Sequence, residues 1–272
     1  MNKTIFITGA SSGIGKATAK QFASEGWNVI ATMRNPQDDD ELKNIENVDV
    51  LALDVTNPEQ VEKVVKSVID THNIDVVFNN AGYGLSGPLE TLSDERIIKQ
   101  LNTNFLGVVR VTKTFVPYFK QRKSGLFLTT TSMAGVVGLP FNSIYCASKW
   151  ALEGFAEALY YELHPYNIQV KTIAPGAVYT DFGMKNIDAS HLPEYDDISK
   201  KYMEYMLGDM TNIAESMTSA DYVANTVFDI VNDNKDQIRY IAGKDAEEMY
   251  SDRMELGNDG FRRKLSGILF EE

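Results

Sequence analysis

The sequence has few of the residues that build disulfides and metal sites. Its single cysteine, Cys146, cannot form an intramolecular disulfide, and such low cysteine usage is typical of a reducing cytosol. One cysteine and three scattered histidines do not supply a zinc site, so we expect no metal centre. Cys146 could act as a redox switch, but a small buried core residue is the simpler interpretation.

Long apolar runs and clusters of positive charge are also missing. No stretch of about 18 apolar residues occurs, which excludes a typical transmembrane helix. The N-terminal residues 1–7 enter a strand-like run at once and lack the apolar segment and cleavage site of a signal peptide. The 26 basic residues are outnumbered by 38 acidic ones, which gives a net charge of −12. We therefore expect a cytoplasmic protein that binds neither nucleic acid nor an anionic membrane.

What the chain does contain is an alternation of short apolar runs and longer helical patterns. The apolar runs are rich in β-branched and aromatic residues and are mostly continuous, as expected of strands covered on both faces. They are Thr4–Thr8, Asn28–Thr32, Val48–Leu53, Val76–Asn79, Gly125–Thr131, Gln169–Ala174 and Arg239–Ala242. The alternation predicts an α/β fold with a doubly wound parallel sheet. No repeat or linker divides the sequence, so we expect one domain over residues 1–272.

Helix signals lie between the apolar runs. Asn57 and Ser93 are placed to cap two helices, the first with Pro58 in its first turn. An apolar stripe continues the second helix from Leu101 to Phe119, whereas the acidic run Asp38–Glu41 is typical of a solvated loop or a helix start.

The alternation of strand and helix patterns stops between Tyr179 and about Thr218, where no strand is evident. A long insertion after the carboxyl end of a strand is where such sheets place ligand sites. Because the insertion carries many Met and Tyr side chains, residues 181–218 are expected to form a lid over a hydrophobic substrate. Helices that pack on the body of the protein are the alternative, and both can hold.

A glycine-rich loop follows the first predicted strand. Gly9, Gly13 and Gly15 are spaced G-x-x-x-G-x-G between a strand and a helix. Glycines allow a tight turn and bring bare backbone close to a pyrophosphate, while the helix N-terminus supplies unpaired N–H groups. The context predicts a dinucleotide site, with an ordinary glycine turn as the alternative.

Tyr145 and Lys149 stand at i and i+4 in a helical pattern, which places their side chains on one face. A free phenol has a pKa of about 10. A nearby ammonium stabilises the phenolate, so we expect Lys149 to lower the pKa of Tyr145 and make it a general acid and base.

Several motifs stand together in the order and spacing of the short-chain dehydrogenase/reductase family, which the chain resembles to about Thr180. The motifs are Thr8–Gly15, Asn79-Asn80-Ala81-Gly82, Asn104, Ser132, Tyr145 with Lys149, and Pro175-Gly176. The stretch Gly138–Gly154 is especially similar to the branch of estradiol-type hydroxysteroid and retinol dehydrogenases. The resemblance implies a single Rossmann-type domain with a seven-stranded sheet. It also implies hydride transfer between a nicotinamide cofactor and a carbonyl or alcohol.

The resemblance gives four residues catalytic roles. Tyr145 would exchange a proton with the reacting oxygen, and Lys149 would hold the nicotinamide ribose. Ser132 would hydrogen-bond the reacting oxygen, where an ordinary loop serine is the alternative. Asn104 would hold a proton-relaying water, and an exposed or locally bonded helix Asn is the alternative.

The residues at the end of the second predicted strand indicate which cofactor is preferred. An acidic residue there would accept the adenosine ribose hydroxyls, but this chain has Met33 and Arg34. A guanidinium suits a phosphate, so we expect NADP(H) to be preferred, with NAD(H) still possible. The resemblance implies a cofactor set of Gly9, Ser11, Ser12, Gly13, Ile14, Gly15, Arg34, Asp54, Val55, Asn80, Ala81, Gly82, Tyr145, Lys149, Pro175, Gly176, Val178 and Thr180. Asp54 could instead be a turn residue before the helix capped by Asn57.

The substrate is expected to be a small hydrophobic ketone or alcohol. Ser132, Phe141, Asn142, Tyr145 and Phe182 are the residues expected to border it. A nucleotide-sensing protein without catalysis is the alternative function, and a sugar-nucleotide epimerase or dehydratase is a weaker one. The apolar runs Ile97–Phe119 and Tyr145–Leu163 could form the interface of a homodimer or homotetramer, although core packing explains the same stripes.

Overall fold

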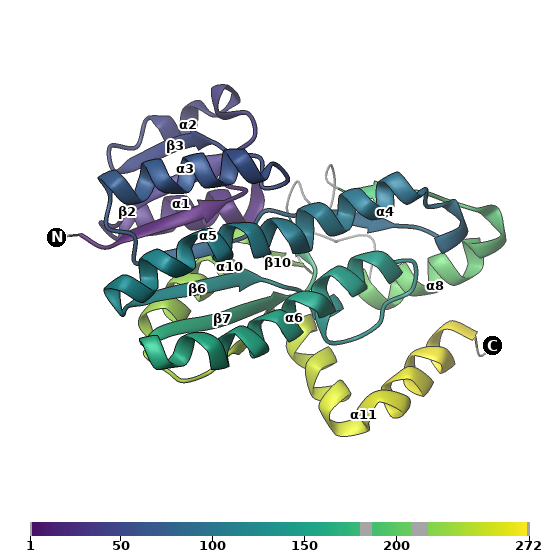
Figure 1. The fold of residues 1–272 in the computed structure, drawn as a ribbon. Coiled ribbons are helices and arrows are strands. Elements are labelled where there is room, and N and C mark those ends of the chain that lie inside the picture. The colour runs from purple at the N-terminus through teal and green to yellow at the C-terminus, as the bar shows by residue number, and fades with distance from the viewer. Residues whose placement is uncertain (1, 180–186, 208–216, 271–272) are drawn as a thin grey trace.

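The computed structural model describes residues 2–179, 187–207 and 217–270, and its central element is a seven-stranded parallel sheet (Figure 1). The strand order is β11-β7-β6-β4-β1-β2-β3. The bounds are β1 Thr4–Thr8, β2 Asn28–Met33, β3 Val48–Ala52, β4 Val76–Asn79, β6 Gly125–Thr130, β7 Ile168–Pro175 and β11 Arg239–Ala242. The predicted doubly wound parallel sheet is confirmed, and each strand end lies within one residue of its predicted position.

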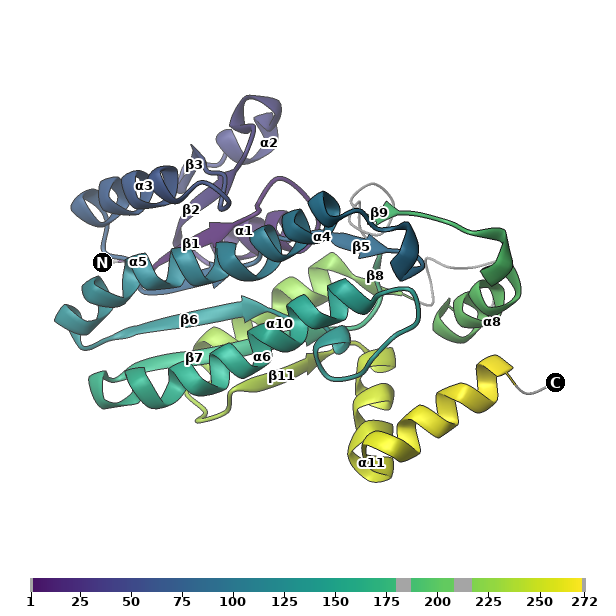
Figure 2. The same cartoon turned by 45° about the vertical axis from the view of Figure 1, so that its right-hand side comes forward.

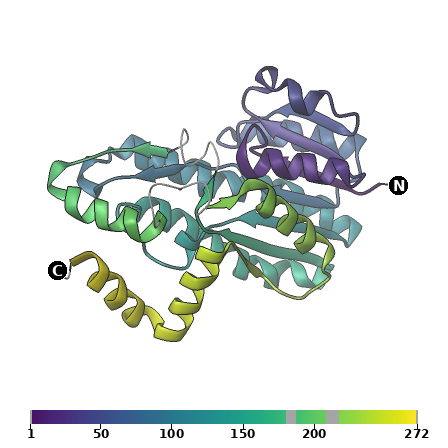
Figure 3. The same cartoon turned by 180° about the vertical axis from the view of Figure 1, so that it is seen from behind.

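Helices cover both faces of this sheet (Figures 2 and 3). On one face α1 (Gly13–Ser24) and α10 (Ala220–Asn232) bury Phe22 and Val227 against the sheet. On the other face lie α3 (Pro58–Thr71), α5 (Gly107–Arg122) and α6 (Ser143–Leu163), which form a second core with side chains of the sheet. The strands therefore read as continuous apolar runs because both of their faces are buried.

The predicted helix caps are present. Asn57 Oδ1 accepts a hydrogen bond from the backbone N–H of Gln60 at 3.0 Å, and Ser93 Oγ accepts from Arg96 N at 3.5 Å at the start of α4 (Asp94–Leu101). Asp39 caps α2 (Asp40–Lys43) in the same way, so the acidic run is a helix start.

The stripe from Leu101 to Phe119 is not one regular helix. Between α4 and α5 the residues Asn102–Leu106 form a π-helical segment. Such segments insert one residue into a turn and often occur at functional sites. Here the π-helical segment contains Asn104, a residue predicted to be functional.

Shorter elements surround the carboxyl end of the sheet. They are β5 (Gly84–Ser86), β8 (Val178–Tyr179), β9 (Ile187–Ala189), β10 (Thr218–Ser219), α8 (Asp196–Leu207), α11 (Lys244–Phe270) and the 3₁₀ turns Pro36–Asp38, Leu89–Thr91, Met133–Gly135, His164–Tyr166 and Pro193–Tyr195. Helix α11 bends at Gly257, where φ is 66°, and packs with α8 in a third apolar cluster.

One prediction about this region is wrong. The insertion was expected to contain no strand, but β9 pairs with β5 and β10 pairs with β8, both in parallel. Ladders of two or three residues are too short to produce a periodic sequence pattern. Among the helices of the described ranges, none is long and apolar enough to cross a membrane. The single domain, the lid and the cytoplasmic location stay predictions.

Candidate active site

A cavity of about 810 Å³ opens at the carboxyl edge of the sheet. Its wall is built by the segments that follow six of the seven strands. They contribute Gly9 and Ser11–Ile14, Met33 and Arg34, Leu53–Thr56, Asn80–Tyr83, Thr130–Ser132, and Pro175 with Gly176 and Val178. Open parallel sheets bind ligands at this edge, where neighbouring loops diverge.

The glycine loop brings bare backbone to one end of the cavity. Gly9 has φ +70°, and a Cβ there would lie 2.7 Å from the Cα of Ala81. Gly15 lies behind the loop rather than on the cavity wall, and its Cβ would lie 2.3 Å from Gly9 O. Ser12 precedes α1 and makes no capping hydrogen bond with its side chain. A glycine cradle at a helix N-terminus fits the pyrophosphate of a dinucleotide.

Asn80 ties this loop to the centre of the sheet. Its Nδ2 donates to Thr8 O at 3.2 Å and to Gly9 O at 3.1 Å, and its Oδ1 accepts from Thr130 Oγ1 at 3.2 Å. The backbone N–H groups of Asn80 and Ala81 both donate to Thr8 Oγ1. The loops after β1, β4 and β6 are thus fixed relative to one another.

The residues expected around the adenosine lie at the end of β2 and β3. Arg34 is exposed on the cavity wall, whereas Met33 is buried. Asp54 Oδ1 accepts hydrogen bonds from Thr56 N at 2.9 Å and Thr56 Oγ1 at 2.7 Å. Asp54 is therefore a turn residue before α3 and also a wall residue, so the two interpretations of its role are compatible.

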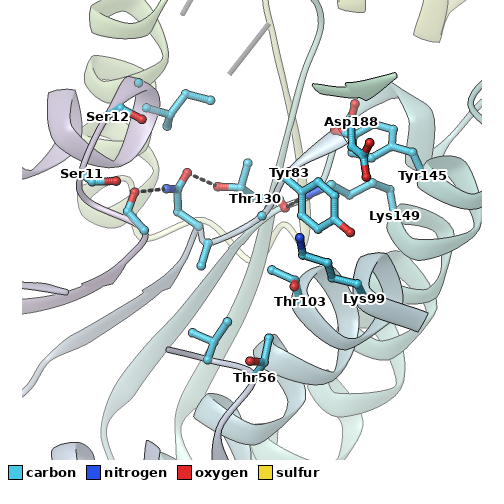
Figure 4. A pocket seen from close by; sticks show the side chains of 18 of the residues that line it. Ser11, Ser12, Thr56, Tyr83, Lys99, Thr103, Thr130, Tyr145, Lys149 and Asp188 are labelled. Carbon is cyan, nitrogen blue, oxygen red and sulfur yellow. Dashed lines mark hydrogen bonds between the residues drawn. The ribbon is translucent and has the colours of Figure 1, made fainter. Parts of the chain in front are cut away.

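At the other end, Tyr145 and Lys149 line the same cavity (Figure 4). Ser132 lines it as well. Tyr145 and Lys149 come from the first turns of α6, and Ser132 follows β6. Lys149 is buried, and its Nζ donates to Thr130 O at 2.8 Å. The same Nζ lies 5.7 Å from the centre of the Tyr145 ring. The predicted helical pair is therefore present and faces the predicted nucleotide site.

The electrostatics of this pair differ from the expectation. Burial raises the pKa of Tyr145 to about 12, although a hydrogen bond with Ser132 favours the phenolate. Burial lowers the pKa of Lys149 to about 8, while the charge of Glu153 raises it. The expected lowering of the Tyr145 pKa is thus wrong, because desolvation of the phenolate is the larger effect and the ammonium is directed to Thr130.

Asn104 is buried behind this end of the cavity rather than on its wall. Its Oδ1 accepts from Tyr83 N at 3.0 Å, and its Nδ2 donates to Tyr83 O at 2.9 Å and to Ser148 Oγ at 3.5 Å. The side chain is therefore neither exposed nor locally bonded. It fixes the backbone after β4 against α6, and its role toward a water stays a prediction.

The nicotinamide end of the predicted site is held by α11. Asp245 Oδ2 accepts from Ala177 N at 2.6 Å, and a Cβ on Gly176 would lie 2.1 Å from the same oxygen. Pro175, Gly176 and Val178 line the cavity. Thr180 and Phe182 lie outside the described residues.

Two predicted substrate residues do not line this cavity. Phe141 packs edge-on against Tyr195 and Tyr202, with ring centres 5.7 and 6.3 Å away. Asn142 donates to Pro140 O at 2.7 Å and precedes α6. Phe141 therefore faces α8, and Asn142 bonds within its own loop. The sequence pattern around Tyr145 does not reveal these contacts.

Other wall residues were not singled out as site residues by sequence reasoning, although Met33 was noted beside Arg34, and Ile187 and Asp188 fall within the predicted lid segment 181–218. They are Met33, Leu53, Thr56, Tyr83, Glu95, Ile98, Lys99, Asn102, Thr103, Thr130, Thr131, Ile187 and Asp188. Tyr83 directly follows the Asn79–Gly82 motif, which was an available signal. Ile187 and Asp188 lie on β9, and the sequence gives no local signal for the pairing of β9 with β5.

Comparisons with known proteins agree with this geometry. The 3-ketodihydrosphingosine reductase of Bacteroides thetaiotaomicron is 42% identical over 179 residues, which are 65% of this chain and 65% of that protein. Human retinol dehydrogenase 8 is 35% identical over 212 residues, covering 75% of this chain and 68% of that protein. A short-chain dehydrogenase structure from Streptomyces avermitilis has a TM-score of 0.81 and 27% identity, and the match covers 97% of this chain and 95% of that one.

A similar structure of an alcohol dehydrogenase from Thermococcus sibiricus, complexed with 5-hydroxy-NADP, has a TM-score of 0.70 and 27% identity, and the match covers 89% of this chain and 96% of that one. The sequence profile described as short chain dehydrogenase matches residues 3–190. The glycine cradle, Ser132, Tyr145 and Lys149 lie around one cavity. The chain belongs to the short-chain dehydrogenase family of NAD(P)-dependent oxidoreductases that act on CH–OH groups.

Proposed function

We propose that the protein is an NADP(H)-dependent reductase that converts a hydrophobic ketone or aldehyde into an alcohol. The observation that carries the proposal is the convergence of Ser132, Tyr145 and Lys149 on one end of a cavity whose other end is a glycine cradle. The nicotinamide supplies the hydride when bound, and the residues of this chain orient the reactants and move the proton.

Tyr145 is the proton donor. With its pKa raised to about 12, the phenol keeps its proton at neutral pH and can give it to the oxygen of a carbonyl being reduced. In the reverse direction the same group would have to lose its proton to act as the base. A preference for NADP(H) favours the direction of reduction.

Ser132 and Lys149 assist this transfer. Ser132 Oγ accepts from Ala134 N at 3.1 Å, so its hydroxyl stays a donor, which hydrogen-bonds Tyr145 here and would turn to the reacting oxygen of a bound substrate. Lys149 is fixed by Thr130 and places its positive charge near the site where the phenolate forms. The two residues would hold the reacting oxygen and stabilise the charge that develops there.

Preference for NADP(H) is supported by the charges at the end of β2. Arg34 is exposed on the cavity wall, where its guanidinium suits a 2′-phosphate. The nearby acidic groups are compensated, because Lys16 Nζ lies 3.2 Å from Asp39 and 2.9 Å from Glu41. Arg34→Ala should weaken NADPH binding and spare NADH, measured by titration calorimetry. Equal losses for both nucleotides would show that Arg34 does not read the phosphate.

A hydrophobic substrate is supported by apolar side chains on the cavity wall. Ile98, Val178 and Ile187 line the cavity together with the ring of Tyr83. The names of the two curated relatives, a ketodihydrosphingosine reductase and a retinol dehydrogenase, point the same way. We therefore propose a lipid-like carbonyl compound as the substrate class.

The test is to follow NADPH absorbance with a panel of long-chain ketones, aldehydes and small polar carbonyl compounds. Turnover that increases with the alkyl length of the carbonyl compound would support the proposal. Tight NADPH binding without turnover on any compound would instead support a nucleotide-sensing protein. A homodimer or homotetramer stays a proposal, which light scattering coupled to size-exclusion chromatography tests.

A further inference from the structure

Strand β9 forms part of the cavity wall but is a very short strand. Its three residues Ile187–Ala189 pair in parallel with Gly84–Ser86 of β5 (Figure 2). A two-stranded ladder of this length is marginal in water, so other contacts must hold it. We call β5, β9 and the side chain of Arg96 the β5–β9 clasp.

Arg96 of α4 binds β9 with both arms of its guanidinium. Its Nε donates to Asp188 Oδ2 at 3.1 Å, and its Nη2 donates to Asp188 Oδ1 at 2.6 Å. The remaining nitrogen, Nη1, donates to Ser190 Oγ at 3.3 Å and to Thr91 O at 3.4 Å. A bidentate pair fixes direction as well as distance, so one side chain on α4 sets the position of Asp188 and Ser190.

The backbone around the clasp is tightly fitted. Ser190 N donates to Ser86 O at 2.9 Å, and the hydroxyl groups of Ser190 and Thr91 are 2.6 Å apart. Gly87 has φ +141°, and a Cβ there would lie 2.5 Å from Ser190 Oγ. The chain after β9 therefore follows one path, and any shift of Ser190 would disturb several hydrogen bonds together.

The clasp bears directly on the proposed reaction site. Ile187 and Asp188 line the same cavity as Tyr145 and Lys149, and Figure 4 places Asp188 on their side of it. Arg96 does not line the cavity. We propose that Arg96 is a positioning residue that holds β9 as the substrate wall and thereby sets substrate affinity. This inference rests on the proposed function.

The variants separate positioning from direct contact. In Arg96→Ala, KM for 2-decanone at saturating NADPH should rise about tenfold, because a charge-assisted pair contributes about that factor. The value of kcat should change less than KM, because the reacting groups are untouched. The KM of Arg96→Lys should fall between those of the wild type and Arg96→Ala, since an ammonium cannot bridge both carboxylate oxygens. Adding Asp188→Asn to Arg96→Ala should raise KM little further if the two residues act as one unit.

Arg122→Ala is the matched control. Arg122 Nη2 pairs with Asp75 at 3.0 Å, and both side chains are 29% exposed. Asp75 precedes β4, so this pair lies at the opposite edge of the sheet from the cavity. Arg122→Ala should lower stability without raising KM for 2-decanone.

Amide hydrogen exchange supplies a readout that needs no catalysis. Arg96→Ala should accelerate exchange at Ile187–Ser190 relative to β1, and Arg122→Ala should not. The inference is overturned if exchange at Ile187–Ser190 is unchanged, or if KM rises no more than in Arg122→Ala. Absence of turnover in the wild type on the whole carbonyl panel would count against the proposed function, and exchange would still decide whether Arg96 holds β9.

Discussion

The role of the glycine cradle in nucleotide binding can be tested with two glycines that share a backbone conformation but differ in their surroundings. Gly9 has φ +70° and Gly26 has φ +78°. A Cβ on Gly26 would meet nothing within 4 Å, whereas a Cβ on Gly9 would lie 2.7 Å from Ala81 Cα and 3.0 Å from Ala81 N. Gly26→Ala therefore measures the cost of positive φ alone, and Gly9→Ala adds a backbone clash inside the cradle.

The expected magnitudes follow from these contacts. Positive φ costs an alanine about 1–2 kcal/mol, and the stiffer unfolded chain offsets about 0.4–1 kcal/mol of it. Gly26→Ala should thus lower the free energy of unfolding by about 1 kcal/mol. Gly9→Ala should lower it further and should weaken NADPH binding at least about tenfold, or about 1.4 kcal/mol, because Ala81 must move away from the loop.

Urea denaturation and calorimetric titration with NADPH measure the two quantities. NADPH affinity in Gly26→Ala should equal that of the wild type. If Gly9→Ala binds NADPH as tightly as Gly26→Ala does, the loop is not the cradle that we describe.

Two further predictions concern pH and packing. The reduction rate should fall as pH rises through about 8, since the Lys149 ammonium is lost there, and Glu153→Gln should move this fall to lower pH because the Glu153 charge raises the pKa of Lys149. An unshifted profile of rate against pH in Glu153→Gln would exclude this coupling. Phe115 is fully buried with its ring centre 5.0 Å from that of Phe6, so Phe115→Ala should cost about 3–5 kcal/mol of unfolding free energy. Phe270→Ala, at a side chain that is 63% exposed, should cost less than about 0.5 kcal/mol by the same urea assay.

Much of the fold could be predicted because it depends on local patterns. Strands buried on both faces leave continuous apolar runs, and Asn57 caps its helix with a contact only three residues away. The cavity wall was predictable where a segment that follows a strand also carries a recognisable motif. The glycine loop and Asn80–Gly82 belong to this group.

The remainder depends on contacts between distant segments. Arg96 and Asp188 are 92 residues apart, and nothing near either one signals their pairing. The pKa of Tyr145 was predicted in the wrong direction because spacing reveals the neighbouring ammonium but not the burial of the phenol. Phe141 was expected to border the substrate, and the sequence did not reveal that it packs against α8.

The central claim is that the phenol of Tyr145 donates the proton in a carbonyl reduction. The most direct measurement is the single-turnover rate of NADPH oxidation at pH 7 with the best ketone of the panel. Tyr160→Phe is the control, because Tyr160 lies on the same helix but bonds Asp236 at the exposed surface. Tyr145→Phe should slow the reaction about 10²–10⁴-fold with NADPH affinity unchanged. A rate in Tyr145→Phe equal to that in Tyr160→Phe would contradict the claim.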